Sequence, residues 1–184
     1  MAYSRSRSWA GIEVVLESYG WGLGRKWRDP LEGLPMTTDL ESRIRQLEDR
    51  ALISERVIKY AMAVDRADWE MFADCFTDPV HADYSENGMP AADFARDDLV
   101  GIVREALGGY TATQHLSTNH VIEFDENDSD RALCYSYMYA QHYREGAEGG
   151  FFLLRGSYTN YMLRTSDGWR IESLTQHVSW SDGE

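Results

Sequence analysis

Cysteine, proline, basic residues and long apolar runs are all scarce in this sequence of 184 residues, which has two cysteines and four prolines. Cys75 and Cys134 lack the paired spacing of a zinc site and are too few for a disulfide framework. We therefore expect a reduced, cytoplasmic protein. The longest apolar runs, such as residues 151–154, are far shorter than the ~20 residues that span a bilayer, so we expect no membrane segment.

Positive charge is also low: 18 Lys and Arg stand against 31 Asp and Glu, a net charge of −13. Such a balance repels phosphate backbones and anionic lipid surfaces, so we expect neither nucleic acid nor membrane as a partner. A chain of this length is typical of one globular domain that buries enough surface to build a core and a pocket.

Tyrosine, by contrast, is abundant, with 11 Tyr against 6 Phe and 6 Trp. A buried tyrosine carries a hydroxyl that needs a hydrogen-bond partner. The composition therefore indicates an interior that is partly polar.

The first 35 residues differ from the rest of the chain. They carry five basic and four acidic side chains, which leaves a net charge of −14 for residues 36–184. They contain no apolar stretch long enough for a secretion signal. We interpret residues 1–35 as a poorly ordered extension or a mis-assigned start, with Met36 as the natural first residue and one domain over 36–184.

Helical periodicity comes first along the chain and strand-like alternation follows it. Apolar residues recur at steps of three and four from Leu40 to Met62, and two shorter helices are expected at 68–75 and 97–107. An Asp78-Pro79 step is expected to end the first of these two. Four long antiparallel strands are then expected at residues 113–124, 132–144, 151–165 and 169–179. Helices followed by a curved sheet predict an α+β fold with a cleft between the two layers.

Alternation within the strands predicts which side chains face that cleft. In the second strand one face carries Ser136, Met138, Ala140 and His142, and the other carries Tyr135, Tyr137, Tyr139 and Tyr143. The same reasoning groups His115, Ser117 and Asn119 in the first strand, and Ser157, Thr159 and Tyr161 in the third. The row of Tyr135, Tyr137 and Tyr139 predicts a contact surface, and hence a homo-oligomer.

Two histidines, His115 and His142, lie well inside predicted strands beside apolar neighbours. Histidine titrates near neutrality and is the most common general acid or base. Asp65, at the end of the first helix, has the chemistry needed to orient an imidazole and fix its tautomer. The alternative is a pair of hydrogen-bonded structural histidines and an aspartate that makes a turn. We interpret His81, His120 and His177 as structural or rim residues. We interpret the acidic residues Asp97-Asp98 as a helix cap and those in Asp125–Asp130 as a solvated turn without a metal site.

Six short motifs in the same order carry a family resemblance. They are Tyr-Ala-Met-Ala-Val-Asp-Arg-Ala-Asp-Trp (60–69), Asp83-Tyr84, Thr-Gln-His (113–115), His142-Tyr143, Gly-Ser-Tyr-Thr-Asn (156–160) and Asp-Gly-Trp-Arg-Ile (167–171). On these, the chain after Met36 resembles the SnoaL-like branch of the nuclear-transport-factor-2-like superfamily, which includes scytalone dehydratase, bile-acid 7α-dehydratase and hexachlorocyclohexane dehydrochlorinase.

The resemblance implies a cone-shaped α+β barrel that encloses a pocket and needs neither metal nor organic cofactor. It places a catalytic Asp–His pair on Asp65 and His115, a second pocket histidine on His142 and a pocket tyrosine on Tyr84. It implies substrate-binding roles for Ser157, Thr159, Tyr60, Val64 and Trp69. The chain departs from scytalone dehydratase at Val64, where that family has a tyrosine, and at Thr159, where it has an asparagine; Asn160 is one step away.

The functional expectation is a cofactor-independent lyase that removes water or another leaving group from a small hydrophobic cyclic substrate of aromatic, polyketide-like or steroid-like type. An isomerase or polyketide cyclase with the same Asp–His pair is one alternative, and a non-catalytic binding module is another. His142 and Ser157 are expected to protonate or bind the leaving group. The resemblance implies a homotrimer first and a dimer second.

Overall fold

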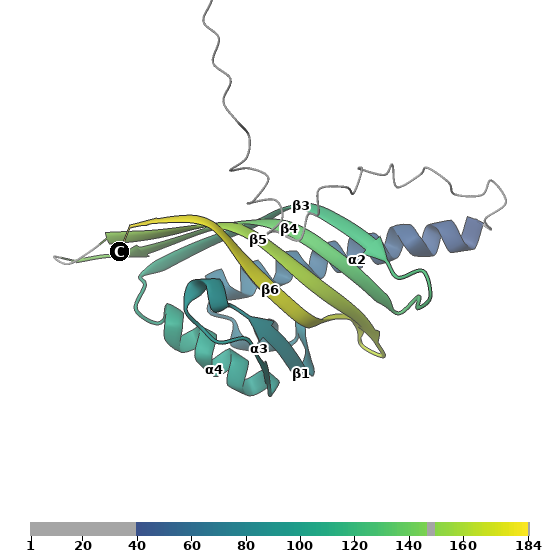
Figure 1. Cartoon of the computed structure of the whole chain (residues 1–184), viewed down its shortest axis with the longest axis horizontal. Helices are drawn as coiled ribbons and strands as arrows, with labels where there is room; N and C mark the ends of the chain where they lie inside the picture. Colours follow the sequence, from purple (N-terminus) through teal and green to yellow (C-terminus); the bar gives the residue numbers. More distant parts are fainter. Residues whose placement is uncertain (1–39, 147–149, 184) are drawn as a thin grey trace, which may run out of the picture. The chain divides into compact units, whose positions relative to one another are not determined.

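The computed structural model describes residues 40–146 and 150–183; the predicted extension over 1–35 lies outside this range. The three expected α-helices are present: α2 (Leu40–Asp65), α3 (Trp69–Ala73) and α4 (Arg96–Leu107). They do not all precede the strands, because two short strands lie between α3 and α4 in the chain. Figure 1 shows α2 as a long helix that runs alongside the sheet, with α3 and α4 below it. No helix in the described part of the chain is long and apolar enough to cross a membrane.

Helix α2 buries one stripe of its surface against the sheet. Ile53, Val57, Tyr60 and Val64 recur at steps of three and four residues and are almost completely buried. Most of the contacts that α2 makes with the sheet are to strand β3 (Ala112–Phe124). Asp65 is the last residue of α2, so the packing of this stripe sets where its carboxylate lies.

Six strands form a single mixed sheet in the order β2-β1-β6-β5-β4-β3. The four long strands were expected from the sequence: β3, β4 (Arg131–Arg144), β5 (Gly150–Thr165) and β6 (Gly168–Gly183). Strands β1 (Phe76–Asp83) and β2 (Ala92–Phe94) were not expected. The prediction that the Asp78-Pro79 step ends a helix was wrong, because α3 ends at Ala73 and Pro79 lies within β1.

The pairing of β1 makes the sheet mixed, because β1 runs parallel to β6 while all other neighbours are antiparallel. The four expected strands pair antiparallel, as predicted, and the parallel pair comes from β1, which was not expected. The predicted α+β class is confirmed, with the N-terminal helices packed against the sheet.

One face of the sheet, here called the inner face, packs on α2 and builds the core. Its buried side chains include Ile122, Cys134, Met138, Ala140, Leu154 and Met162. The opposite, outer face carries the alternate residues of the same strands. Every residue proposed for chemistry must lie on the inner face to reach the space between the sheet and α2.

Candidate active site

Asp65 and His115 form a direct pair at the edge of the core. The Nδ1 atom of His115 lies 2.7 Å from Oδ1 of Asp65, and the backbone N–H of His115 donates to Oδ2 at 2.8 Å. Thr113 Oγ1 donates to Oδ1 at 2.9 Å. Two strand residues and one helix terminus thus converge on one carboxylate, which brings together two residues that are 50 positions apart in the chain.

The electrostatics of this pair favour a charged aspartate. Burial raises the pKa of Asp65, but the hydrogen bonds from the side chain and backbone of His115, the charge of His115 and the bond from Thr113 outweigh it, so the pKa is lowered. An ionised carboxylate accepts hydrogen bonds only, so Nδ1 of His115 carries the proton. The lone pair of a neutral His115 then lies on Nε2.

His142 lies next to His115, as the sequence predicted. The two rings meet edge to face with centroids 5.1 Å apart, and the ring of Tyr110 lies 4.8 Å from that of His142. Nδ1 of His142 is 3.1 Å from the carbonyl oxygen of Phe152, which can only accept, so Nδ1 carries a proton. Burial lowers the pKa of His142, and the charge of His115 lowers it further. A neutral His142 therefore presents an acceptor at Nε2.

A chain of buried hydroxyls lies between α2 and the sheet. The Tyr60 hydroxyl is 3.3 Å from the hydroxyls of both Tyr84 and Tyr158, and Nε2 of Gln176 donates to Tyr158 at 2.8 Å. Burial raises the pKa of all three tyrosines, so each keeps its proton. The Oε1 atom of Gln176 has no partner among the described residues.

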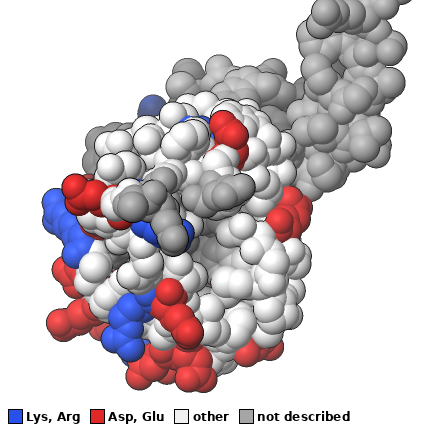
Figure 2. All heavy atoms as spheres, turned by 90° about the vertical axis from the view of Figure 1, so that its left-hand side faces the viewer, with Lys and Arg blue, Asp and Glu red and all other residues white. Residues whose placement is uncertain are grey.

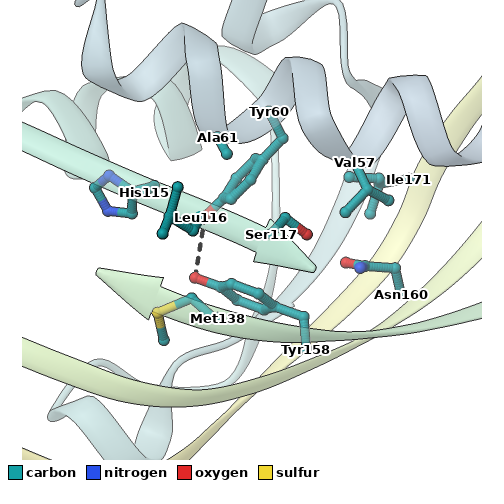
Figure 3. Close-up of a pocket in the computed structure, with 10 residues that line it drawn as sticks. All are labelled: Val57, Tyr60, Ala61, His115, Leu116, Ser117, Met138, Tyr158, Asn160 and Ile171. Atoms are coloured by element: carbon teal, nitrogen blue, oxygen red, sulfur yellow. Dashed lines mark hydrogen bonds between the residues drawn. The ribbon is translucent and has the colours of Figure 1, made fainter. Parts of the chain in front are cut away.

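A small cavity of about 10 Å³ lies between His115 and the hydroxyls of Tyr60 and Tyr158 (Figure 3), which is room for about one water molecule. His142 does not line it but contacts His115 beside it. His115 lies at one side of it, the Tyr60 and Tyr158 hydroxyls point toward each other within it, and Ser117 and Asn160 lie at the other side. The lining residues are Val57, Tyr60, Ala61, His115, Leu116, Ser117, Met138, Tyr158, Asn160 and Ile171, of which none is Lys, Arg, Asp or Glu.

Strand β5 has the opposite phase to the one expected. Tyr158 and Asn160 are buried and line the cavity, so Ser157 and Thr159 point to the outer face. Thr159 Oγ1 is 3.3 Å from Nε2 of His177 on β6. Ser157 and Thr159 therefore do not line the cavity, and Tyr158, which was not predicted as a site residue, does.

The remaining predicted binding residues lie at different depths. Tyr60 lines the cavity. Tyr84 does not line it; its side chain is 5% exposed, and its hydroxyl contacts the hydroxyl of Tyr60. Val64 belongs to the buried stripe of α2 and Trp69 packs edge to face on Phe72, and neither lines the cavity.

His120 lies on the inner face, although simple alternation from His115 and Ser117 would place it on the outer face. Nδ1 of His120 is 2.7 Å from Ser54 Oγ and Nε2 is 3.0 Å from Ser117 Oγ. His81 is an exposed partner of Asp93 at the sheet edge, at 2.7 Å. His177 is half-buried on β6, with Nδ1 3.5 Å from Glu86.

The outer face carries the predicted tyrosine row. Tyr137 and Tyr139 are 55% and 44% exposed, and Tyr135 is half-buried. Tyr143, Phe151, Tyr161 and Trp180 extend the same face and are also about half exposed. Figure 2 shows charged side chains gathered along the lower and left parts of its view, and a broad area without them at the right.

Among residues 40–146 and 150–183, no group of three or more His, Cys, Asp or Glu side chains is arranged to hold a metal ion. The expectation that the protein needs no metal or organic cofactor stays a prediction.

Comparison with known proteins identifies the family. The model of the SnoaL-like domain matches residues 45–175. The Kfla4162 protein from Kribbella flavida is 30% identical, with a TM-score of 0.69 over 74% of this chain and 95% of that one. No curated protein matches the chain significantly.

Two similar structures bear the names of elimination enzymes. A hexachlorocyclohexane dehydrochlorinase, LinA type 2, is 17% identical with a TM-score of 0.68, over 77% of this chain and 93% of that one. A protein from Novosphingobium aromaticivorans, provisionally named a scytalone dehydratase, is 18% identical with a TM-score of 0.65, over 77% and 89%. These two show the shared fold, and the family match covers most of the described chain. The protein therefore belongs to the SnoaL-like domain family, within the NTF2-like fold.

Proposed function

We propose that this protein is a cofactor-independent lyase, which eliminates water or another leaving group from an uncharged cyclic hydroxy-ketone. The observation that carries the proposal is the Asp65–His115 pair, held at 2.7 Å beside a cavity that His115 itself lines. An elimination next to a carbonyl needs a base for the C–H proton, a donor for the developing enolate oxygen and a proton for the departing hydroxyl.

His115 is suited to be the base. With its Nδ1 proton held by the Asp65 carboxylate, Nε2 takes the proton from the carbon beside the carbonyl. The C–H bonding electrons move to form the enolate, and the negative charge of Asp65 stabilises the imidazolium. When the enolate collapses, the C–O bond to the leaving group breaks, and the proton on Nε2 passes to that oxygen to form water.

The tyrosine chain is suited to hold the enolate oxygen. Three hydroxyls carry three protons, and the two contacts between them use two, which leaves one O–H to donate to a ligand. Because Tyr60 and Tyr158 line the cavity, a carbonyl oxygen beside them is within reach of that donor. Their raised pKa values keep the donor protonated across the physiological range.

His142 is better suited to bind the leaving group than to protonate it. Its pKa is lowered and its Nδ1 proton is directed at the Phe152 carbonyl, so Nε2 accepts a hydrogen bond from the substrate hydroxyl. Ser157, which we expected to assist, lies on the outer face. The proton that leaves with the hydroxyl therefore comes from His115.

A ring-sized substrate needs more room than the cavity of about 10 Å³ provides. Met138 is the lining residue best able to move, because its unbranched side chain has several rotatable bonds. The apolar part of the lining favours the hydrophobic cyclic substrate expected from the sequence. The elimination reactions named for two structures of the same fold support the same class of chemistry.

The test is deuterium incorporation from D₂O into a panel of cyclic hydroxy-ketones, with loss of water followed by mass spectrometry. Wild type should exchange the proton beside the carbonyl and lose water, and His115→Ala should lower both rates by about 10²–10⁴-fold. His81→Ala is the matched control, because His81 also pairs with an aspartate at 2.7 Å but lies at the exposed sheet edge.

Exchange without loss of water would move the assignment to an isomerase or cyclase. Binding of panel members without exchange of any proton would favour the non-catalytic module. Equal rates for wild type and His115→Ala would contradict the role of the pair.

A further inference from the structure

Strand β3 contains a bulge that turns an additional histidine into the interior. Asn119 has a φ of 56°, and the pairing of β3 with β4 shifts between Thr118 and Val121. One extra residue in a strand reverses the alternation that follows it. His120 therefore joins His115 and Ser117 on the inner face, although its number has the opposite parity.

His120 is held at both ring nitrogens. Ser54 of α2 lies 2.7 Å from Nδ1 and Ser117 of β3 lies 3.0 Å from Nε2. Burial lowers the pKa of His120, against a contribution from the Ser117 backbone that raises it, so the ring is neutral at pH 7. A neutral imidazole has one N–H donor and one acceptor, and the hydroxyls of Ser54 and Ser117 can serve either.

The tautomer of His120 therefore determines what Ser117 offers to the cavity. When Ser54 donates to Nδ1, the N–H at Nε2 donates to Ser117, and the Ser117 proton is free for a ligand. In the other tautomer Ser117 donates to His120, and its lone pairs are free instead. Ser117 can thus bind either a donor or an acceptor.

Asn160 provides a separate sign of a ligand at this position. It is 2% exposed and lines the cavity, yet no hydrogen bond of its side-chain amide is found among the described residues. Its amide meets the space of the cavity, where a ligand or a water molecule can satisfy it. Figure 3 shows the Asn160 amide and the Ser117 hydroxyl pointing toward the same part of the cavity, and this part lies on the side opposite His115.

The chemistry of this end of the cavity selects an uncharged oxygen. None of the ten lining residues is Lys, Arg, Asp or Glu, and His115 lies at the other side of the cavity, so a carboxylate or phosphate at this end has no permanent counter-charge. A hydroxyl or a ketone can be satisfied fully by Ser117 and Asn160. His115 and Ser117 are two residues apart on one face of a strand, which separates their Cα atoms by about 7 Å.

We propose that Ser117, held by His120, forms a second recognition point of the substrate site, which binds a hydroxyl or carbonyl oxygen located about 7 Å from the carbon that His115 deprotonates. The proposal rests on the proposed function for the position of the reacting carbon. It defines the substrate class further: a cyclic ketone with a second, uncharged oxygen on the far side of its ring system.

Two ketones that differ in one oxygen test this proposal: 2-tetralone and 6-hydroxy-2-tetralone. Their affinities are measured by titration calorimetry with wild type, Ser117→Ala and His120→Phe, and thermal unfolding checks that each variant is folded. Thr118→Ala is the control, because Thr118 is the next residue on β3 and is exposed. Deuterium exchange on the same samples reports on the base independently of binding.

Wild type and Thr118→Ala should bind the hydroxylated ketone roughly three- to tenfold more tightly than 2-tetralone, the value of one hydrogen bond. Ser117→Ala and His120→Phe should remove this preference and leave the affinity for 2-tetralone within about twofold of wild type. A role confined to folding would weaken both ketones together and keep their ratio.

The proposal is overturned if wild type binds the two ketones equally or binds neither at millimolar concentration, or if Ser117→Ala keeps the preference. Selective binding without deuterium exchange would support this recognition point while contradicting the role of His115 as the base. Exchange without selective binding would support His115 as the base and contradict the recognition point.

Discussion

Asp65 holds His115 by two bonds at once: Oδ1 lies 2.7 Å from Nδ1 of the ring, and Oδ2 accepts the backbone N–H of the same residue at 2.8 Å. The second bond ties the carboxylate to the strand, so the ring and its partner move as one unit. The orientation of the His115 ring thus depends on Asp65 as well as on the packing of β3.

Asp65→Asn is expected to lower the rate of deuterium exchange by about 10²–10⁴-fold, because an amide neither fixes the tautomer nor stabilises the imidazolium. Thr113→Val removes only the bond to Oδ1 and should cost less than about tenfold. The measurement is the exchange assay described above, with circular dichroism to verify folding. A fully active Asp65→Asn protein would contradict the proposed function.

Tyr158→Phe should reduce exchange by about 10²-fold, the usual loss when one donor to a developing oxyanion is removed. The substitution keeps the ring and deletes only the hydroxyl that contacts Tyr60 and Gln176. Tyr137→Phe is the control, since Tyr137 is 55% exposed on the outer face. Similar rates in both variants would remove the tyrosine chain from the mechanism.

The ionised Asp74 carboxylate is expected to stabilise the fold, and this stabilisation should be lost in acid. Burial raises its pKa, but hydrogen bonds from Lys59 and Arg56 and the charge of Arg170 lower it from 3.8 to about 2. A depressed folded pKa contributes stability above the unfolded value, and this contribution is lost as the pH falls from about 4 to 2.

Asp74→Asn should therefore differ from wild type in unfolding free energy by a constant amount between pH 5 and pH 7, and the difference should shrink below pH 4. Urea titrations followed by tryptophan fluorescence measure it. Arg170→Gln should reduce the same acid dependence, because Arg170 contacts Asp74 at 2.8 Å. If the difference in unfolding free energy at pH 2 were as large as at pH 7, Asp74 would act by packing alone.

Asp49→Ala should destabilise the fold by about 3 kcal/mol, the usual cost of removing one partner of a buried ion pair. Arg164 contacts both carboxylate oxygens of Asp49, and the buried Trp169 donates to one of them at 3.0 Å. Asp130→Ala removes the exposed partner of Arg164 and should cost less than about 1 kcal/mol. Equal values in denaturant titrations would contradict this division.

The outer face is expected to bind a second copy of the chain. Large side chains that are about half exposed follow one another across β4, β5 and β6, and contiguous apolar surface of this kind marks contact sites. Light scattering after size exclusion should show an oligomer for wild type and a smaller species for Tyr137→Glu. Gln46→Glu, which adds the same charge at an exposed position of α2, should leave the mass unchanged. A monomeric wild type would contradict the expectation.

Local patterns in the sequence determined much of this fold. The three- and four-residue steps of α2 placed Asp65 at its end, and the alternation of small and aromatic residues in β4 placed His142 inside and Tyr137 outside. The assignment in β4 succeeds because its two faces differ strongly in size and polarity, so burial permits one orientation only. In α2 the periodicity predicted the helix but not its buried side, because Leu40, Leu47 and Met62 of the predicted apolar series are at least 40% exposed. The stripe from Ile53 to Val64 packs on the sheet instead.

Only the tertiary structure decided the phase of β5 and of the second half of β3. Both faces of β5 mix apolar and polar side chains, so Tyr158 and Asn160 cannot be distinguished from Ser157 and Thr159 by alternation alone. Pairing with β4 and β6 sets that phase, and it is a long-range property.

Long-range pairing also sets two other features. One is the parallel pairing of β1 with β6, and the other is the left-handed Asn119 that turns His120 inward. The sequence by itself therefore identified Asp65, His115 and His142 as candidates for one site. The pairing of distant strands decided that the tyrosine chain and the Ser117–His120 contact lie beside them, because the inward face of a strand is selected by its neighbours as well as by its own residues.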